Sequence, residues 1–233
     1  MVLVSTVGFA GYFLTKKFGS RAGLWLSGLL GGIVSSTAVS IAAGRIAQRS
    51  PDRSVNALQS TILASSVMYI RILALIWFVK PEFVQYVWLK LVLLAGIGLA
   101  LSIHKEVEVP DSVKPPVQTV KNPFEIRPAL IFASLFVILS VVTVLAERFY
   151  GQAGLLTLAG IVGVTDIDPF ILSIVNQQAL VIDLAVAALI ISMMSNTIVK
   201  GIYFGFLAKN VRKSVAWRFG LWALLHLPIL FIR

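Results

Sequence analysis

The stretch GGIVSSTAVS, Gly31 to Ser40, decides the predicted fold of this chain. It lies inside an apolar run, residues 24–46, that is long enough to cross a membrane as one helix. Two consecutive glycines open the stretch and four hydroxyl side chains follow. Glycine weakens a helix, and a serine or threonine caps the start of a new one. The stretch therefore predicts a break, with a second half-helix beginning near Ala38. The candidate caps are Ser35, Ser36 and Thr37.

The composition of the whole chain indicates a membrane protein. Of its 233 residues, 58% are hydrophobic and only 13% are charged, with a mean hydropathy of +0.92. A soluble domain is about half apolar and about a quarter charged. The chain has no cysteine, which excludes disulfides, thiolate metal sites and cysteine nucleophiles. We therefore expect an all-α integral membrane protein.

Eight apolar segments follow one another along the chain: residues 2–14, 24–46, 57–79, 83–103, 128–145, 155–175, 180–208 and 215–232. The first resembles a signal peptide, but its basic residues come after the apolar run instead of before it, so we expect it to stay as a membrane helix. A stretch rich in proline and charge separates the fourth segment from the fifth. The predicted organisation is a first membrane repeat at 1–105, a cytoplasmic linker at 106–127 and a second membrane repeat at 128–233.

The two halves of the sequence match each other in order. Phe18–Leu24, FGSRAGL, matches Phe149–Leu155, FYGQAGL, and further similarities continue over roughly 80 residues. Later in each half, SSVMYIRI aligns with MSNTIVKG, which places Arg71 opposite Lys200. This pattern predicts an internal duplication.

The distribution of basic residues tests two topologies. If all eight segments cross the membrane, nine lysines and arginines lie on one side and eight on the other. If the second and sixth segments enter and leave on one side, fourteen lie on one face and three on the other, which is a strong positive-inside signal. That model gives two inverted repeats, each with three spanning helices plus one broken or re-entrant helical segment. Eight simple transmembrane helices remain the alternative, because both doubtful segments are long enough to span once.

The sixth segment carries the second predicted break, in GIVGVTDIDPFILSI. Thr165, Asp166 or Asp168 is the candidate cap, and Pro169 suits the first helical position. A carboxylate within hydrocarbon costs at least about 3 kcal/mol, so it usually faces a cavity, an ion or a basic partner. We expect Asp166 and Asp168 to be metal ligands. The predicted ion-binding residues are Ser35, Ser36, Thr37, Thr165, Asp166 and Asp168.

Arg71 and Lys200 are unusual because each lies some distance into an apolar helix. Either they extend to the membrane surface, or they face the broken helices, where they neutralise the two acids or attract an anion. Ser195 and Asn196 lie one turn before Lys200 and share its face. These four residues are the predicted charge partners and polar neighbours of the site.

Simpler interpretations stay open for the same residues. Glycine and serine in membrane helices often only permit close packing, and TDIDP is also compatible with an exposed turn. Asp183 is interpreted as a surface charge at a helix N-terminus. The glycine and serine positions concerned are Gly28, Gly31, Gly32, Ser35 and Ser36.

The sequence contains no phosphate-binding loop, dinucleotide fingerprint, zinc motif or catalytic triad spacing, so we expect neither an enzyme nor a bound cofactor. The net charge of +10 is assigned to cytoplasmic loops, not to nucleic-acid binding.

The predicted function is a transporter or channel-like protein for a small ion, with a divalent cation as one candidate and a midplane site between two broken helices. We expect the protein to lie in the inner (cytoplasmic) membrane, with its basic loops in the cytoplasm. It is expected to form a homo-oligomer or to bind a membrane partner protein. The alternative is a non-transporting scaffold or regulatory subunit that binds its partner through glycine-rich faces.

The boxes GLLGGIVSSTAV, LASSVMYIRIL and GIVGVTDIDPFILS resemble the membrane domain that often follows MgtC/SapB-type domains in bacterial and archaeal proteins. The resemblance covers nearly the whole chain. It implies a multi-pass membrane domain, and the association with MgtC-type domains hints at magnesium or other ion homeostasis. No MgtC-type domain precedes these boxes, so we expect a stand-alone form or one half of a split system. The resemblance names no substrate.

Overall fold

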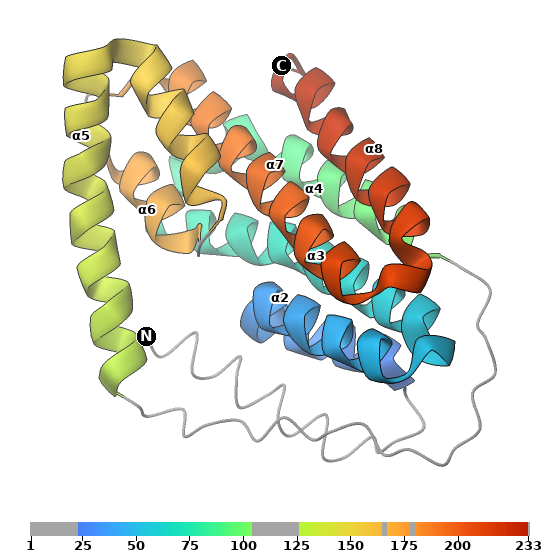
Figure 1. The fold of residues 1–233 in the computed structure, drawn as a ribbon. Helices are drawn as coiled ribbons and strands as arrows, with labels where there is room; N and C mark the ends of the chain where they lie inside the picture. Colours follow the sequence, from blue (N-terminus) through green and yellow to red (C-terminus); the bar gives the residue numbers. More distant parts are fainter. Residues whose placement is uncertain (1–22, 104–125, 165–166, 178–179, 233) are drawn as a thin grey trace. The chain divides into compact units, whose positions relative to one another are not determined.

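The computed structural model describes residues 23–103, 126–164, 167–177 and 180–232, which form helices and no strand within those ranges (Figure 1). Short 3-10 helices precede three of the α-helices, and they are η2 (Pro51–Arg53), η3 (Pro81–Phe83) and η4 (Lys209–Val211). The α-helices are α2 (Gly23–Arg49), α3 (Ser54–Val79), α4 (Val84–Ser102), α5 (Ile126–Val162), α6 (Asp168–Asn176), α7 (Ile182–Leu207) and α8 (Arg212–Leu230). The predicted all-α class is confirmed.

Four helical stretches of the described chain are long and apolar enough to cross a membrane. This confirms the general prediction of an α-helical membrane protein. Judged by length and composition, they are Pro51–Val79, Pro81–Ser102, Phe136–Val162 and Ile182–Leu207, of which Phe136–Val162 contains a turn at Gly151.

Proline sets two of the junctions between these helices. Ser50 precedes Pro51 and Lys80 precedes Pro81, and both residues leave the helical conformation, with φ of -132° and -149°. A proline disfavours the helical conformation of the residue before it, so α2 and α3 end at these points. The next helix then starts with the proline, which needs no amide hydrogen there.

Helix α2 is bent at Ser35, where φ is -162° and ψ is 104°. A Cβ atom added to Gly31 would lie 2.6 Å from Cγ2 of Val39. In a straight helix these two residues would be about 12 Å apart along the axis. The two halves of α2 therefore lie against each other at the bend, and Figure 1 shows two helical runs in the blue segment. The predicted break in this segment is confirmed.

Helix α5 reverses direction at Gly151, whose φ of 60° and ψ of -150° favour glycine. After the turn, a Cβ atom on Gly154 would lie 2.5 Å from the carbonyl oxygen of Ala146. The second half of α5 therefore runs back along the first, as the yellow segment of Figure 1 shows. The helix then ends at Val162, and α6 begins at Asp168. The sixth apolar segment is thus also broken, as the sequence predicts.

The described residues form two compact units. The first unit contains residues 23–71, 95–103 and 200–218, and its buried core includes Leu58 and Ile62. The second contains residues 72–94, 126–199 and 219–232, and its buried core includes Phe170, Leu189 and Trp222. The bend of α2 belongs to the first unit, and the break between α5 and α6 belongs to the second.

Candidate functional site

Ser35 caps the second half of α2. The backbone N–H of Ala38 donates a hydrogen bond to Oγ of Ser35 at 3.2 Å. The start of a half-helix leaves several N–H groups without a partner in the helix, and this bond satisfies one of them. The predicted half-helix start near Ala38 is therefore confirmed, with Ser35 as its cap. The neighbouring Thr37 is half-buried.

Lys200 reaches the bend of α2 from α7. Its Nζ donates a hydrogen bond to Oγ of Ser36 at 2.7 Å and lies 3.0 Å from Sδ of Met68. Lys200 is 1% exposed and Ser36 is 4% exposed. Burying an ammonium costs several kcal/mol, and the hydrogen bond to the Ser36 hydroxyl supplies part of the compensation. The structure thus brings two of the predicted site residues into direct contact.

The glycines of the opening stretch have separate roles. A Cβ atom on Gly28 would lie 2.6 Å from the carbonyl oxygen of Ser60, and one on Gly32 would lie 2.6 Å from Cα of Ala64. These two glycines let α2 approach the α3 backbone closely, so the packing interpretation is correct for them. Ser36 is different, because its hydroxyl accepts a hydrogen bond from a buried cation.

At the second break, α7 supplies two side chains to the end of α5. Oγ of Ser195 donates a hydrogen bond to the carbonyl oxygen of Gly160, and Nδ2 of Asn196 donates to that of Gly163 at 2.9 Å. The last carbonyls of a helix have no partner within it, so these bonds satisfy groups that the break exposes. A Cβ atom on Gly163 would overlap the Ser195 side chain. Ser195 and Asn196 therefore stabilise the break directly.

Asp168 is the first residue of α6 and is 9% exposed. The N-cap is Ile167 and makes no side-chain cap hydrogen bond, so Asp168, one of the three candidate caps, is not the cap. Pro169 is the second helical residue, one position later than predicted. In the first turn, the Asp168 carboxylate lies at the positive end of the helix dipole.

Two predicted site residues, Thr165 and Asp166, lie outside the described residues. Across the ranges that the structure does describe, no three or more histidine, aspartate or glutamate side chains gather into a possible metal site. The metal site at Asp166 and Asp168 stays a prediction.

Arg71 is half-buried in α3. The hydroxyls of Ser65 and Ser66, one turn earlier, each donate to a carbonyl of their own helix at 2.9 Å. Both hydroxyls are therefore hydrogen-bonded within α3.

Met68, which contacts Lys200, was not predicted as a site residue, because a methionine in an apolar helix looks the same as any other core residue.

These features define an α-helical membrane protein with buried polar groups at its helix breaks. The chain belongs to a family described as a domain of unknown function (DUF4010), which matches residues 2–208. A protein of Aquifex aeolicus (strain VF5), named "Uncharacterized protein", is 26% identical over 196 residues, which cover 80% of this chain and 83% of that protein. No solved structure matches the chain. The family match confirms the resemblance stated from the sequence boxes, while the association with MgtC-type domains stays a prediction.

Proposed function

We propose that this protein is a membrane transporter or channel-like protein for a small ion, with its ion-binding groups at the two helix breaks. The contact between Lys200 and Ser36 carries the proposal. Both side chains are buried, and they meet where α2 leaves the helical conformation.

The depth of Lys200 supports a functional role. It lies seven residues before the end of α7, a helix long and apolar enough to span a membrane. At 1.5 Å per residue, that distance is about 10 Å along the helix. A charged side chain at such a depth usually belongs to an ion or proton pathway, because a purely structural position would favour an apolar side chain.

Two breaks in segments that match each other support an inverted repeat. Irregular backbone within a membrane is tolerated where it is buried in protein or lines a cavity that contains water. In many secondary transporters, broken helices at matching positions of two inverted repeats carry the binding groups. We assign that arrangement to the bend of α2 and to the break between α5 and α6.

The proposed topology places the basic loops in the cytoplasm and both broken segments as hairpins that enter and leave on one side. Single cysteines at Ser20 and Ser50, which flank the α2 segment, test it in a chain that has no other cysteine. Both should react with a membrane-impermeant thiol reagent from the cytoplasmic side. Reaction from opposite sides would show that α2 spans the membrane.

The two breaks carry side chains of opposite charge, so the break that binds the transported ion determines whether that ion is a cation or an anion. Asp168, together with Asp166, would bind a cation through carboxylate oxygens, and a divalent cation is the first candidate. Lys200 at the first break would instead favour an anion. Flux of both kinds of ion should therefore be measured on the same preparation.

The direct test compares two acids that both lie in the first turn of a helix. Asp168 is buried in α6, whereas Asp183 is exposed in α7. In proteoliposomes, Asp168→Asn should reduce ion flux strongly, and Asp183→Asn should leave it close to that of the parent. Equal flux from the parent and both variants would show that Asp168 does not bind the ion. If the parent carries no common cation or anion, the transport proposal is wrong.

The second candidate function is a non-transporting scaffold or regulatory subunit. Gly28 and Gly32 are already packed against α3, so they are not available to a partner. Gly96 in α4 and Gly220 in α8 have open space where a side chain would be, and they offer surfaces for a partner helix. A partner that copurifies in fixed ratio with the parent, and is lost from Gly96→Leu or Gly220→Leu, would favour this function.

A further inference from the structure

Two turns that are far apart in the sequence are joined by hydrogen bonds within the first unit. Nδ2 of Asn210 in η4 donates to the carbonyl oxygen of Pro51 in η2 at 2.9 Å. The Asn210 amide is also hydrogen-bonded to Oγ of Ser54, at 2.9 Å through Nδ2 and 3.0 Å through Oδ1. Nearby, a Cβ atom on Gly44 would lie 2.7 Å from the Leu207 side chain. The α2–α3 and α7–α8 connections therefore form one continuous surface.

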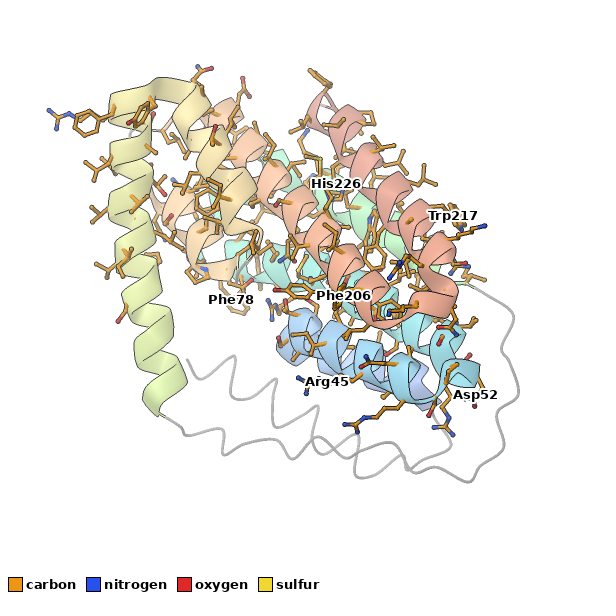
Figure 2. The ribbon with its side chains drawn as sticks, in the orientation of Figure 1. Arg45, Asp52, Phe78, Phe206, Trp217 and His226 are labelled. Atoms are coloured by element: carbon orange, nitrogen blue, oxygen red, sulfur yellow. The ribbon has the colours of Figure 1, made fainter. Side chains whose placement is uncertain are left out.

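This surface is strongly basic, and we call it the basic face. Five of its six basic side chains are exposed, and Asp52 is the acid among them. Figure 2 labels Arg45 and Asp52 on this part of the chain. The basic face consists of Arg45, Arg49, Arg53, Lys209, Arg212 and Lys213.

Helix stability does not explain all of these charges. Arg45 and Arg49 lie near the C-terminus of α2, where a positive charge is favourable. Arg212 and Lys213 lie in the first turn of α8, where a positive charge is unfavourable. Nε of Arg212 donates to the carbonyl oxygen of Gly205 at 3.1 Å, which gives that residue a structural contact. An external anion would offset the unfavourable charge at this helix end.

Exposed aromatic side chains lie beside the basic face. Phe206 is 73% exposed and lies three residues before Lys209, and Trp217 is 53% exposed and lies four residues after Lys213. Figure 2 labels both aromatic side chains. The Arg218 guanidinium lies 5.7 Å from the centroid of the Trp217 ring. Tryptophan is enriched at the level of lipid headgroups, and an exposed phenylalanine suits acyl chains. These side chains indicate that the basic face lies at the membrane surface.

We propose that the basic face binds an anionic phospholipid. Lys209, Arg212 and Lys213 would contact the headgroup phosphate, and the acyl chains would run along Phe206 and Trp217. A cluster of basic residues at the end of membrane helices attracts anionic headgroups, and the adjacent apolar side chains favour a lipid over a free phosphate ion. This proposal does not depend on ion transport.

The test uses the full-length protein in a neutral detergent and measures the binding of phosphatidylglycerol and phosphatidylcholine by native mass spectrometry. The parent should prefer phosphatidylglycerol, and added salt should weaken that preference. The triple variant R49Q/K209Q/K213Q should bind phosphatidylglycerol roughly a hundredfold more weakly, at about fivefold for each charge removed. Its binding of phosphatidylcholine should not change.

The matched control is K80Q/R148Q/R233Q, because the hairpin topology places Lys80, Arg148 and Arg233 on the opposite side of the membrane from the basic face. This variant should keep the preference of the parent. Asn210→Ala changes no charge but breaks the bond between the turns, so it should weaken phosphatidylglycerol binding by a smaller factor. It also serves as the test if the triple variant does not fold. Three results would overturn the proposal: no preference in the parent, an unchanged preference in the variants of the basic face, or displacement of the lipid by millimolar inorganic phosphate.

Discussion

The two helix breaks are stabilised in different ways. At the first, α2 supplies its own cap, because the Ser35 hydroxyl accepts a hydrogen bond from the Ala38 N–H. At the second, the cap comes from another helix, because Ser195 and Asn196 of α7 donate to carbonyls at the end of α5. The first break therefore does not need Lys200 for capping, whereas the second does need Asn196. We infer that Lys200 serves function and that Asn196 serves structure.

The largest expected effect on stability comes from Gly32, which holds the first half of α2 against α3. Gly32→Ala would place a methyl group 2.6 Å from Cα of Ala64, and backbone can move away only if the two helices separate. We expect a loss of about 3 kcal/mol in the free energy of unfolding.

Thermal unfolding in detergent measures this loss, with Gly96→Ala as the matched control. Nothing lies within 4 Å of a Cβ atom on Gly96, so the control should match or slightly exceed the parent in stability. If both variants unfold at the same temperature as the parent, the packing of α2 on α3 does not depend on this close contact.

An intermediate effect is expected from Asn196→Leu at the second break. The substitution keeps the volume but leaves the Gly163 carbonyl without its donor, at a cost of about 2 kcal/mol. Ion flux per folded molecule should stay close to that of the parent, since Asn196 serves structure.

The control for this variant is Asn176→Leu. Asn176 is exposed, and its Nδ2 donates to the Leu172 carbonyl within α6 at 2.8 Å, so its loss should cost less than about 0.5 kcal/mol. A variant Asn196→Leu that is fully stable but transports nothing would contradict the structural role that we assign to Asn196.

The smallest effect is expected from Ser35→Ala, which removes the cap of the first break. Loss of a serine cap typically costs about 1 kcal/mol. Ser140→Ala is the comparison, because the Ser140 hydroxyl donates to a carbonyl of its own helix at 2.7 Å and caps nothing. Unfolding midpoints of the two variants should differ by a few degrees. Equal midpoints would mean that the Ser35 hydrogen bond adds no stability.

The sequence predicts the positions of both breaks because glycines followed by capping residues are a local signal. The contact between Lys200 and Ser36 is not predictable in the same way, since 164 positions separate the two residues. Their meeting depends on how α7 packs, and apolar packing faces leave little pattern in a helix that is hydrophobic on all sides. Asp168, one of the three candidate caps, lies instead in the first turn of α6. Aspartate is common both as a cap and in the first turn, so the sequence does not distinguish the two positions.

The central claim is that the first break serves ion movement, and Lys200→Met tests it most directly. The variant and the parent should be reconstituted at equal amounts of folded protein, with ion flux and the unfolding midpoint measured on the same preparations. Methionine keeps much of the side-chain length and removes the charge of Lys200, so the folded variant should show no ion flux. Unchanged flux, or a fall in midpoint that accounts for the lost flux, would contradict the claim and make Lys200 a structural residue.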